Sequence, residues 1–509
     1  MPVTSSAEFW ERFSYYGMRA ILIFYMYYAV KDGGLGLDRT QANIIMSIYG
    51  SLIYMSGIIG GWISDRITGT QKAVFYGGIL IMVGHILLAL PLGVTALYAS
   101  MFFIIIGTGL LKPNVSAVVG DLYAANDARR DSGFSIFYMG INMGSFIAPL
   151  LVGLFQKNWG FHAGFSVAAV GMFIGLVVFW MSQKNLGLAG VAPTNPMSAD
   201  EKKKAARNFT IGGVVVVILG VIAYMTGNAN VEHFSLLITA LGILIPTIFI
   251  AFMYRSPKTN ADEKSRLLAY IPLFICAVMF WAIAEQSSTI LATFIDTRTN
   301  LHLWGFEIPA AWFQSFNPLF IIVMAPLFAV LWTKLGNRGP STPKKFAMSL
   351  FFSGASFIIM IAAIVLTPEG TLVSPLWVIL SIFLVVLGEL LLSPVGLSAT
   401  TKLAPAAFAG QTMALWFLAS AEASASASAL ESAEASASAS ESAEASASAS
   451  ASASESAEAS ASPLASASAS ARRATSPSRS SRRSRPRPAR RRSPRATRSP
   501  SSRTSSPAT

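Results

Sequence analysis

Long apolar stretches alternate with short polar segments along this chain. Twelve stretches are expected to be helices at residues 8–30, 41–63, 73–92, 96–120, 133–155, 162–182, 208–227, 233–254, 266–296, 310–333, 345–366 and 375–398, and a thirteenth runs from about Ala406 to Phe417. A helix of ~20 residues spans the hydrocarbon core of a bilayer. Helix is the required conformation because lipid cannot satisfy free backbone N–H and C=O groups.

The order of these stretches predicts an all-α polytopic membrane protein built from two halves. Six spans over residues 1–182 form an N-terminal bundle, and residues 183–263 hold basic linkers and two extra helices. Residues 264–418 form a C-terminal bundle that lacks its last one to two helices. Two six-helix halves are typical of secondary transporters.

Basic residues between the spans predict the orientation of the chain in the membrane. With a cytoplasmic N-terminus, eighteen Lys and Arg residues lie in cytoplasmic loops, and only Lys31, Arg39, Lys157 and Arg298 lie outside. Cytoplasmic loops of membrane proteins carry an excess of Lys and Arg. The sequence therefore predicts a multi-pass protein of the cytoplasmic membrane.

Composition agrees with a membrane protein and gives no sign of an enzyme. The 509 residues are 53% hydrophobic and only 12% charged, with a mean hydropathy of +0.54, whereas a soluble domain is about 25% charged. The sequence contains no HExxH, GxSxG or P-loop motif and no Cys/His metal set. We therefore expect neither catalysis nor a bound metal.

The C-terminal region changes character after Leu418. Residues 419–471 are Ala/Ser/Glu-rich and residues 472–509 are Arg/Ser/Pro-rich, so disorder is expected over 419–509. This tail carries +6 of the net charge of +13. Because the break falls inside an apolar stretch, a frameshift or assembly fault is the favoured explanation. The alternative is a genuine basic tail that binds RNA or anionic lipid; no nucleic acid is expected at the body.

Charged residues inside the first apolar stretch indicate a polar interior. Glu8, Glu11, Arg12, Tyr16 and Arg19 recur at spacings of three and four, so they share one helix face. A charge at the centre of a membrane costs at least about 2.5–3.5 kcal/mol. These groups must line a cavity or pair with other helices, and a purely structural salt-bridge cluster is the simpler alternative.

Three further charges lie within later spans. Lys112 occurs in GTGLLKPNVS, Glu285 in FWAIAEQSS and Glu389 in GELLLSPVG. With the first stretch they sum to −1, so one proton would neutralise a cavity that held them all. Breaking and remaking such ion pairs is a means of coupling proton binding to motion.

At this point the motifs resemble those of a known family. FSYYGMR follows ExxER at the start of the chain, and GGWISDR (60–66), GTGLLKPNVS (107–116), FSIFYMGINMGSF (134–146), FWAIAEQSS (280–288), WFQSFNPLF (312–320) and GELLLSPVGLS (388–398) follow in order. The chain resembles the proton-dependent oligopeptide transporters of the major facilitator superfamily, in their bacterial form with two extra helices. The likeness covers about residues 5–418.

The resemblance implies a group of residues that couples transport to protons. Glu8, Glu11 and Arg12 would form it together with Lys112, and Glu285 would pair with Lys112 across the two halves. A proton gradient would be the energy source, and no cofactor is implied. The protein is expected to act as a monomer in the lipid bilayer.

The resemblance also implies a substrate site for di- and tripeptides. Arg19 and Lys112 would meet the peptide carboxylate, and Glu389, Asn142 and Asn317 would meet its ammonium group. The side-chain pockets would be shaped by four aromatic residues: Tyr16, Tyr54, Trp281 and Trp416. Asp65 and Arg66 are expected to pair at cytoplasmic helix ends, in a gating or structural role.

Plainer interpretations stay open for several of these residues. Tyr54, Trp281 and Trp416 could be packing aromatics, and Asn142 and Asn317 could hold helices together by hydrogen bonds. The substrate could be nitrate or another small molecule, as in some relatives of this family. The chain could also be an inactive product of a damaged gene.

Overall fold

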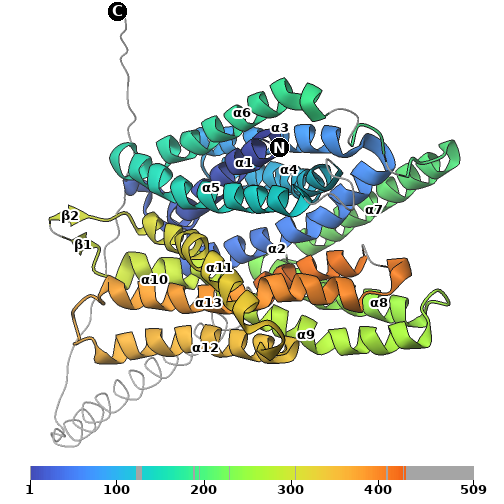
Figure 1. Cartoon of the computed structure of the whole chain (residues 1–509). Helices are drawn as coiled ribbons and strands as arrows, with labels where there is room; N and C mark the ends of the chain where they lie inside the picture. Colours follow the sequence, from blue (N-terminus) through green and yellow to red (C-terminus); the bar gives the residue numbers. More distant parts are fainter. Residues whose placement is uncertain are drawn as a thin grey trace, which may run out of the picture. The chain divides into compact units, whose positions relative to one another are not determined.

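A computed structural model describes residues 2–430, except 122–128, 187–189, 194, 229, 304, 409–410 and 428. The described part is a bundle of long helices with one small hairpin (Figure 1). Most of the region expected to be disordered, residues 431–509, lies outside the described residues.

The N-terminal half contains six long helices: α1 (Pro2–Tyr27), α2 (Arg39–Ile63), α3 (Thr70–Ala89), α4 (Gly93–Asp121), α5 (Arg129–Trp159) and α6 (Phe161–Leu186). Two short turns of helix, η1 (Val30–Asp32) and the π-helical η2 (Ser64–Thr68), lie on either side of α2. Helix α1 packs against α5 and α6, and α4 packs against α2 and α3. The apolar face of α1 thereby becomes the centre of the largest core cluster.

Backbone contacts between glycines bring α2 and α4 together. A Cβ atom at Gly60 would lie 1.9 Å from the carbonyl oxygen of Gly109. Small residues allow helix backbones to approach closely in membranes, where packing replaces the hydrophobic effect as the driving force. This contact fixes α2, which carries Tyr54, beside α4, which carries Lys112.

The two inserted helices are α7 (Ala199–Met225) and α8 (Val231–Arg255). Helix α7 begins with a capping box between Ser198 and Glu201, and none of its residues is buried. Helix α8 packs against α2 and contacts α9. From Phe209 to Met225 apolar residues cover all sides of α7, which is the pattern of a helix that faces lipid.

The C-terminal half contains α9 (Ala261–Glu285), η3 (Gln286–Ser288), α10 (Ile290–Arg298), β1 (His302–Leu303), β2 (Phe306–Glu307), η4 (Ala310–Ser315), α11 (Phe316–Leu335), η5 (Gly336–Arg338), α12 (Thr342–Leu366), α13 (Pro375–Leu403) and η6 (Ala406–Phe408). The span expected over 266–296 is therefore interrupted by η3. Strands β1 and β2 pair antiparallel.

Two names are used below for the ends of the bundle. The end with this hairpin is called the hairpin end. The opposite end is called the basic end, and it carries Arg66, Lys184, Lys334 and Lys402.

Residues 411–427 form a further helix, so the prediction of disorder from residue 419 is wrong for this segment. Its alanines from Ala419 to Ala427 are buried. The hydroxyl of Thr239 on α8 donates to the carbonyl oxygen of Ala425 at 2.7 Å. Gly50 on α2 and Gly242 on α8 lie against this helix. Small Ala and Ser side chains thus allow this segment to pack tightly as a helix, although its composition is typical of disorder.

Eleven described helical segments are long and apolar enough to cross a membrane. The twelve stretches expected from the sequence correspond to these eleven and to α1. At 26 residues, α1 is about 39 Å long, which is enough to cross a membrane; it differs from the eleven by its charged residues and its lower hydropathy. The prediction of a helical membrane protein is confirmed.

Candidate functional site

Helix α1 carries a buried ionic cluster. Arg12 Nε lies 2.9 Å from Glu8 Oε1 and 2.5 Å from Glu11 Oε2. All three residues are at most 3% exposed. The 3–4 residue spacing predicted from the sequence places them on one face, as expected. Gly144 of α5 closes this face, because a Cβ atom there would lie 2.5 Å from the carbonyl oxygen of Phe9.

The polar atoms of this cluster are incompletely satisfied. Neither carboxylate oxygen of Glu11, nor Glu8 Oε2, has a hydrogen-bond partner among the residues described. The Arg12 Nε contacts are ion pairs by distance but do not have hydrogen-bond geometry. An unsatisfied buried charge is costly, so this cluster is a place where a small change in charge has a large effect on free energy.

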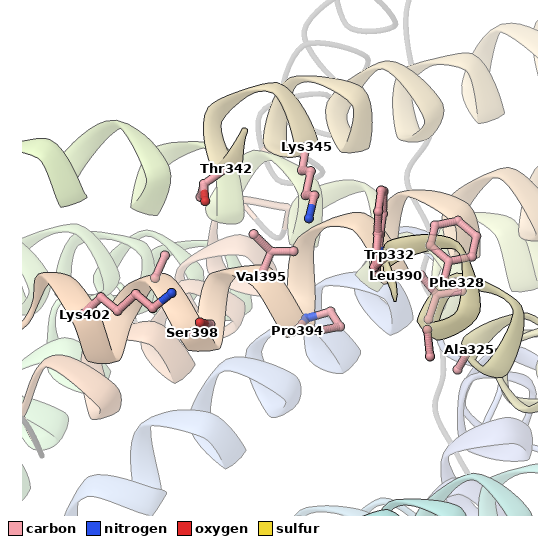
Figure 2. Close-up of a pocket in the computed structure, with 12 residues that line it drawn as sticks. Ala325, Phe328, Trp332, Thr342, Lys345, Leu390, Pro394, Val395, Ser398 and Lys402 are labelled. Atoms are coloured by element: carbon pink, nitrogen blue, oxygen red, sulfur yellow. The ribbon is translucent and has the colours of Figure 1, made fainter. Parts of the chain in front are cut away.

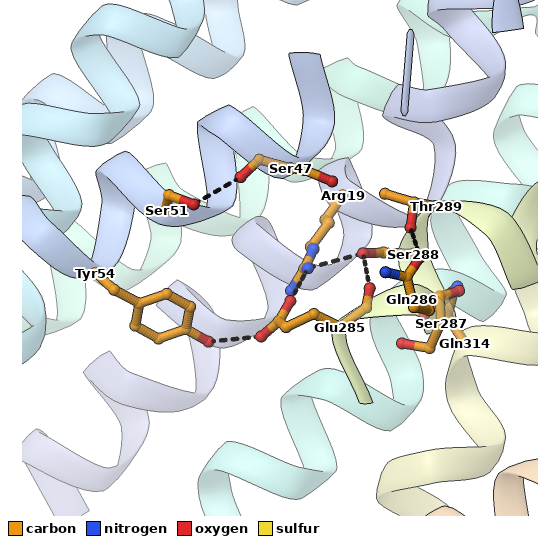
Figure 3. Close-up of polar contacts among 10 residues, drawn as sticks. All are labelled: Arg19, Ser47, Ser51, Tyr54, Glu285, Gln286, Ser287, Ser288, Thr289 and Gln314. Atoms are coloured by element: carbon orange, nitrogen blue, oxygen red, sulfur yellow. Dashed lines mark hydrogen bonds and ion pairs between the residues drawn. The ribbon is translucent and has the colours of Figure 1, made fainter. Parts of the chain in front are cut away.

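Arg19 and Glu285 form an ion pair between the two halves (Figure 3). Arg19 comes from α1, and Glu285 is the last residue of α9. The second oxygen of Glu285 accepts a hydrogen bond from the Tyr54 hydroxyl at 3.2 Å. Arg19 also donates to Ser288 Oγ at 2.7 Å. Glu285 therefore joins α1, α2 and α9 at one point.

The predicted Lys112–Glu285 pair is wrong for this conformation. Arg19 and Tyr54 already contact the two carboxylate oxygens of Glu285. Lys112 instead places its ammonium nitrogen 4.2 Å from the centroid of the Tyr54 ring, which is a cation–π contact. Lys112 still interacts electrostatically with Glu285 and Glu11, so it lies between the two ionic groups.

Glu389 lies in a third group, formed by helices α13, α11 and α5. Asn317 Nδ2 donates to Glu389 Oε2 at 3.3 Å, in agreement with the expected grouping. Asn142 donates to the Tyr138 carbonyl of its own helix at 2.9 Å. Tyr138 interacts electrostatically with Glu389, which brings the third group close to α5.

Tyr16 connects these groups. It interacts electrostatically with Arg12, Arg19, Glu285 and Glu389, and it is half-buried on α1. The seven predicted charges thus converge on one region between the halves. Tyr16 is therefore within electrostatic range of the cations Arg12 and Arg19 and of the carboxylates Glu285 and Glu389.

The aromatic candidates differ in their surroundings. Tyr54 contacts both Glu285 and Lys112, and Trp281 is half-buried beside Phe280. Trp416 is only 4% exposed. The outer edge of its six-membered ring lies against Gly396, where a Cβ atom would be 1.9 Å from Cη2. In this conformation Trp416 is a packing residue.

The sequence predicts that Arg66 pairs with Asp65, but in the structure Arg66 pairs with Glu201 instead. Arg66 Nη2 lies 2.8 Å from Glu201 Oε1 at the start of α7. The carbonyl oxygens of Asp65 and Arg66 accept hydrogen bonds from the backbone of Asn195 and Met197. Neighbouring residues on a helix point in different directions, so Arg66 reaches the inserted helix instead.

Sequence reasoning missed a contact at the hairpin end. The hydroxyls of Tyr27 and Tyr28 each donate to a different oxygen of Asp296 at 2.6 Å. We call these three residues the hairpin-end clasp. Asp296 lies on α10, behind the break at η3. The Gln-Ser-Ser-Thr run at 286–289 was the available signal for that break.

Further contacts between the halves also lie at the hairpin end. Trp312 Nε1 donates to the carbonyl oxygen of Leu150 at 3.0 Å, and Ser315 Oγ donates to that of Phe146 at 2.7 Å. Lys157 Nζ lies 3.1 Å from Glu307 Oε2 on the hairpin. Together with the clasp, these contacts hold the two halves together at this end.

Comparisons with known proteins identify the family to which the chain is similar. Residues 71–446 match the model of the POT family (PTR2). The chain is 59% identical over 419 residues to the uncharacterized transporter YclF of Bacillus subtilis strain 168, covering 82% of this chain and 84% of that protein. It is 48% identical over 424 residues to a di-/tripeptide transporter of Lactococcus lactis subsp. cremoris, covering 81% and 84%.

Solved structures show the same fold. A crystal structure of peptide transporter POT in complex with sulfate is 60% identical, with a TM-score of 0.82 over 84% of this chain and 87% of that chain. A POT family transporter in complex with 5-aminolevulinic acid is 46% identical, with a TM-score of 0.81 over 84% and 89%. The chain has the major facilitator fold and belongs to the POT family of transporters.

Proposed function

We propose that this protein imports di- and tripeptides together with protons across the cytoplasmic membrane. The observation that carries the proposal is the Arg19–Glu285 ion pair between the halves, with Lys112 and Glu389 both within electrostatic range of Glu285. A free peptide is a zwitterion, so a site with a cationic and an anionic side is complementary to it. The peptide transporters among its relatives support the same substrate class.

The ion pair suggests how a proton and a peptide would be coupled. Arg19 is held by Glu285, so it is not free to bind a carboxylate. A proton on Glu285 would remove the charge that holds Arg19. Arg19 and Lys112 would then bind the carboxylate of the peptide. Glu8, Glu11 and Arg12 would act with them, because Lys112 interacts electrostatically with all three.

The ammonium group of the peptide would bind at Glu389. Asn317 already orients one oxygen of this carboxylate, and Asn142 would contribute its amide oxygen. Tyr16, Tyr54 and Trp281 would form walls that accept varied side chains with little directional demand. Trp416 would act indirectly, by holding the C-terminal helix against α13.

The conformation fits one state of an alternating-access cycle. The clasp and the other contacts between the halves at the hairpin end would close the outer side. Basic residues at the opposite end favour a cytoplasmic location for that end and for the N-terminus. The protein would then be open inward, act as a monomer and use the proton gradient without a cofactor.

Uptake into proteoliposomes tests the proposal. The full chain is reconstituted, and accumulation of labelled dialanine is measured with an inward proton gradient. We expect saturable uptake that trialanine competes and a protonophore abolishes. Uptake should fall at least tenfold in Glu285→Ala, whereas Glu369→Ala, which removes an exposed carboxylate outside the contacts between the halves, is the control and should leave uptake unchanged. Two results with folded protein would overturn the assignment. One is dialanine uptake that other peptides do not inhibit, and the other is no dialanine uptake at all.

A further inference from the structure

A cavity of about 390 Å³ lies within the C-terminal half, between α11, α12 and α13. Its lining on α13 runs from Leu390, which directly follows Glu389, to Lys402 at the basic end. Twelve residues line it, and none is acidic. Its polar members are Thr342, Lys345, Ser398 and Lys402. Figure 2 shows the side chains of Lys345 and Lys402 entering this space from two different helices.

The two lysines carry positive charge that no described carboxylate balances. Neither forms an ion pair with Asp or Glu within the described ranges. Lys345 places its ammonium nitrogen 4.1 Å from the centroid of the Trp332 ring. Two unbalanced cations in one concave site attract an anion, because the low-dielectric walls focus their field.

The walls of the cavity are suited to a lipid rather than to a small soluble anion. Phe328 and Trp332 of α11 line it. Helices α11 and α12 each pack on α13. Two apolar residues that line the cavity, Ala329 of α11 and Pro394 of α13, are exposed, and Leu331, which precedes the lining residue Trp332, is 43% exposed. On membrane-spanning helices such side chains face acyl chains, so the cationic cavity continues into a lipid-facing surface.

We infer that this cavity binds the headgroup of an anionic phospholipid from the cytoplasmic leaflet. The ammonium groups of Lys345 and Lys402 contact the phosphate, and the hydroxyls of Thr342 and Ser398 donate hydrogen bonds to its oxygens. Acyl chains lie along Phe328 and the exposed faces of α11 and α12. Basic pockets between helices on the cytoplasmic side are known to take such headgroups. The choice of leaflet rests on the orientation given under the proposed function.

Lipid titration followed by native mass spectrometry tests the site. The full chain, in a non-ionic detergent, is titrated with dioleoyl phosphatidylglycerol and, separately, with dioleoyl phosphatidylcholine. Phosphatidylglycerol should bind at least tenfold more tightly. Lys345→Gln/Lys402→Gln should weaken its binding about 30-fold, since each lysine contributes about 1 kcal/mol. Lys345→Arg/Lys402→Arg should retain binding.

A charge-matched variant controls for a general loss of positive charge. Lys334→Gln/Lys344→Gln removes two exposed lysines that do not line the cavity, and its affinity should stay within threefold of the parent. Lys402 is exposed, so Lys402→Gln alone should fold and weaken binding about fivefold. Melting temperatures of all variants establish that they are folded.

Three results would overturn the inference. Equal weakening of phosphatidylglycerol binding in the cavity variant and in the control variant would mean that the lipid responds to the overall positive charge of the protein and not to this cavity. Binding of glycerol phosphate as tight as that of the lipid would mean a site for soluble anions. Displacement of the lipid by dialanine would mean a peptide site on the exit route. Lipid binding needs no transport, so failed dialanine uptake in proteoliposomes leaves this test intact.

Discussion

The hairpin-end clasp gives the sharpest prediction about conformation. In Tyr27→Phe/Tyr28→Phe the two hydroxyls that donate to Asp296 are lost, while both rings remain. Tyr27 and Tyr28 belong to α1 in the N-terminal half or directly follow it, whereas Asp296 belongs to α10 in the C-terminal half. The double variant should therefore favour separation of the halves at this end.

The expected magnitude follows from the two hydrogen bonds. A hydrogen bond to a charged group contributes about 1.5–3 kcal/mol. The lower figure applies here, because water hydrates both partners once the halves separate. Losing two bonds then costs about 3 kcal/mol, which changes the ratio of closed to open populations about 150-fold. A closed population of 99% would fall to roughly 40%.

Double electron–electron resonance measures this shift. Spin labels at Lys31 and Arg298, both exposed at the hairpin end, report the separation in a Cys276→Ser background. The variant should show a second, longer distance that the parent lacks. Tyr76→Phe/Tyr98→Phe makes the same chemical change at two exposed tyrosines and should leave the distribution unchanged. Identical distributions in the clasp variant and the parent would refute the reasoning.

Three further variants probe the ion pair and the packing. Glu285→Gln should abolish proton-driven accumulation of dialanine but retain exchange across the membrane, since a neutral amide cannot carry the proton; accumulation equal to the parent's would contradict this. Trp416→Ala should lower stability by about 3–5 kcal/mol, measured as a fall in melting temperature larger than that of the half-buried Trp281→Ala. Gly60→Leu should prevent folding, since its Cβ atom would lie 1.9 Å from Gly109 O, whereas Gly57→Leu, which meets nothing within 4 Å, should elute as the parent does in size-exclusion chromatography.

Hydropathy and residue spacing predicted most of the fold and the composition of the site. Apolar length alone locates each span, because lipid leaves the backbone no alternative to helix. The spacing of Glu8, Glu11 and Arg12 fixes them on one face, because the helical period is local. Such features depend on neighbours in the chain and can be predicted from one sequence.

Partner choice between distant helices could not be predicted. Arg19 and Lys112 are both cations near Glu285, and only the packing of α1 against η3 and α10, which directly follow Glu285, decides which one pairs with it. Asp296 gives no pattern in the sequence, because its donors are more than 260 residues away. Disorder was assigned from composition after Leu418, yet Gly50 and Gly242 provide space for a helix without large side chains.

The alternating Ala and Ser residues of the C-terminal helix have a consequence for its axial position. A repeat of two residues looks nearly the same after a shift of two residues along the helix axis, so the repeat itself defines no single register against α2 and α8. Trp416, locked against Gly396, supplies one fixed point. Glu422, which interrupts the alternation of Ala and Ser, lies against Gly242 and supplies a second fixed point. The axial position of the helix is therefore decided by Trp416 and Glu422 and not by the small residues around them.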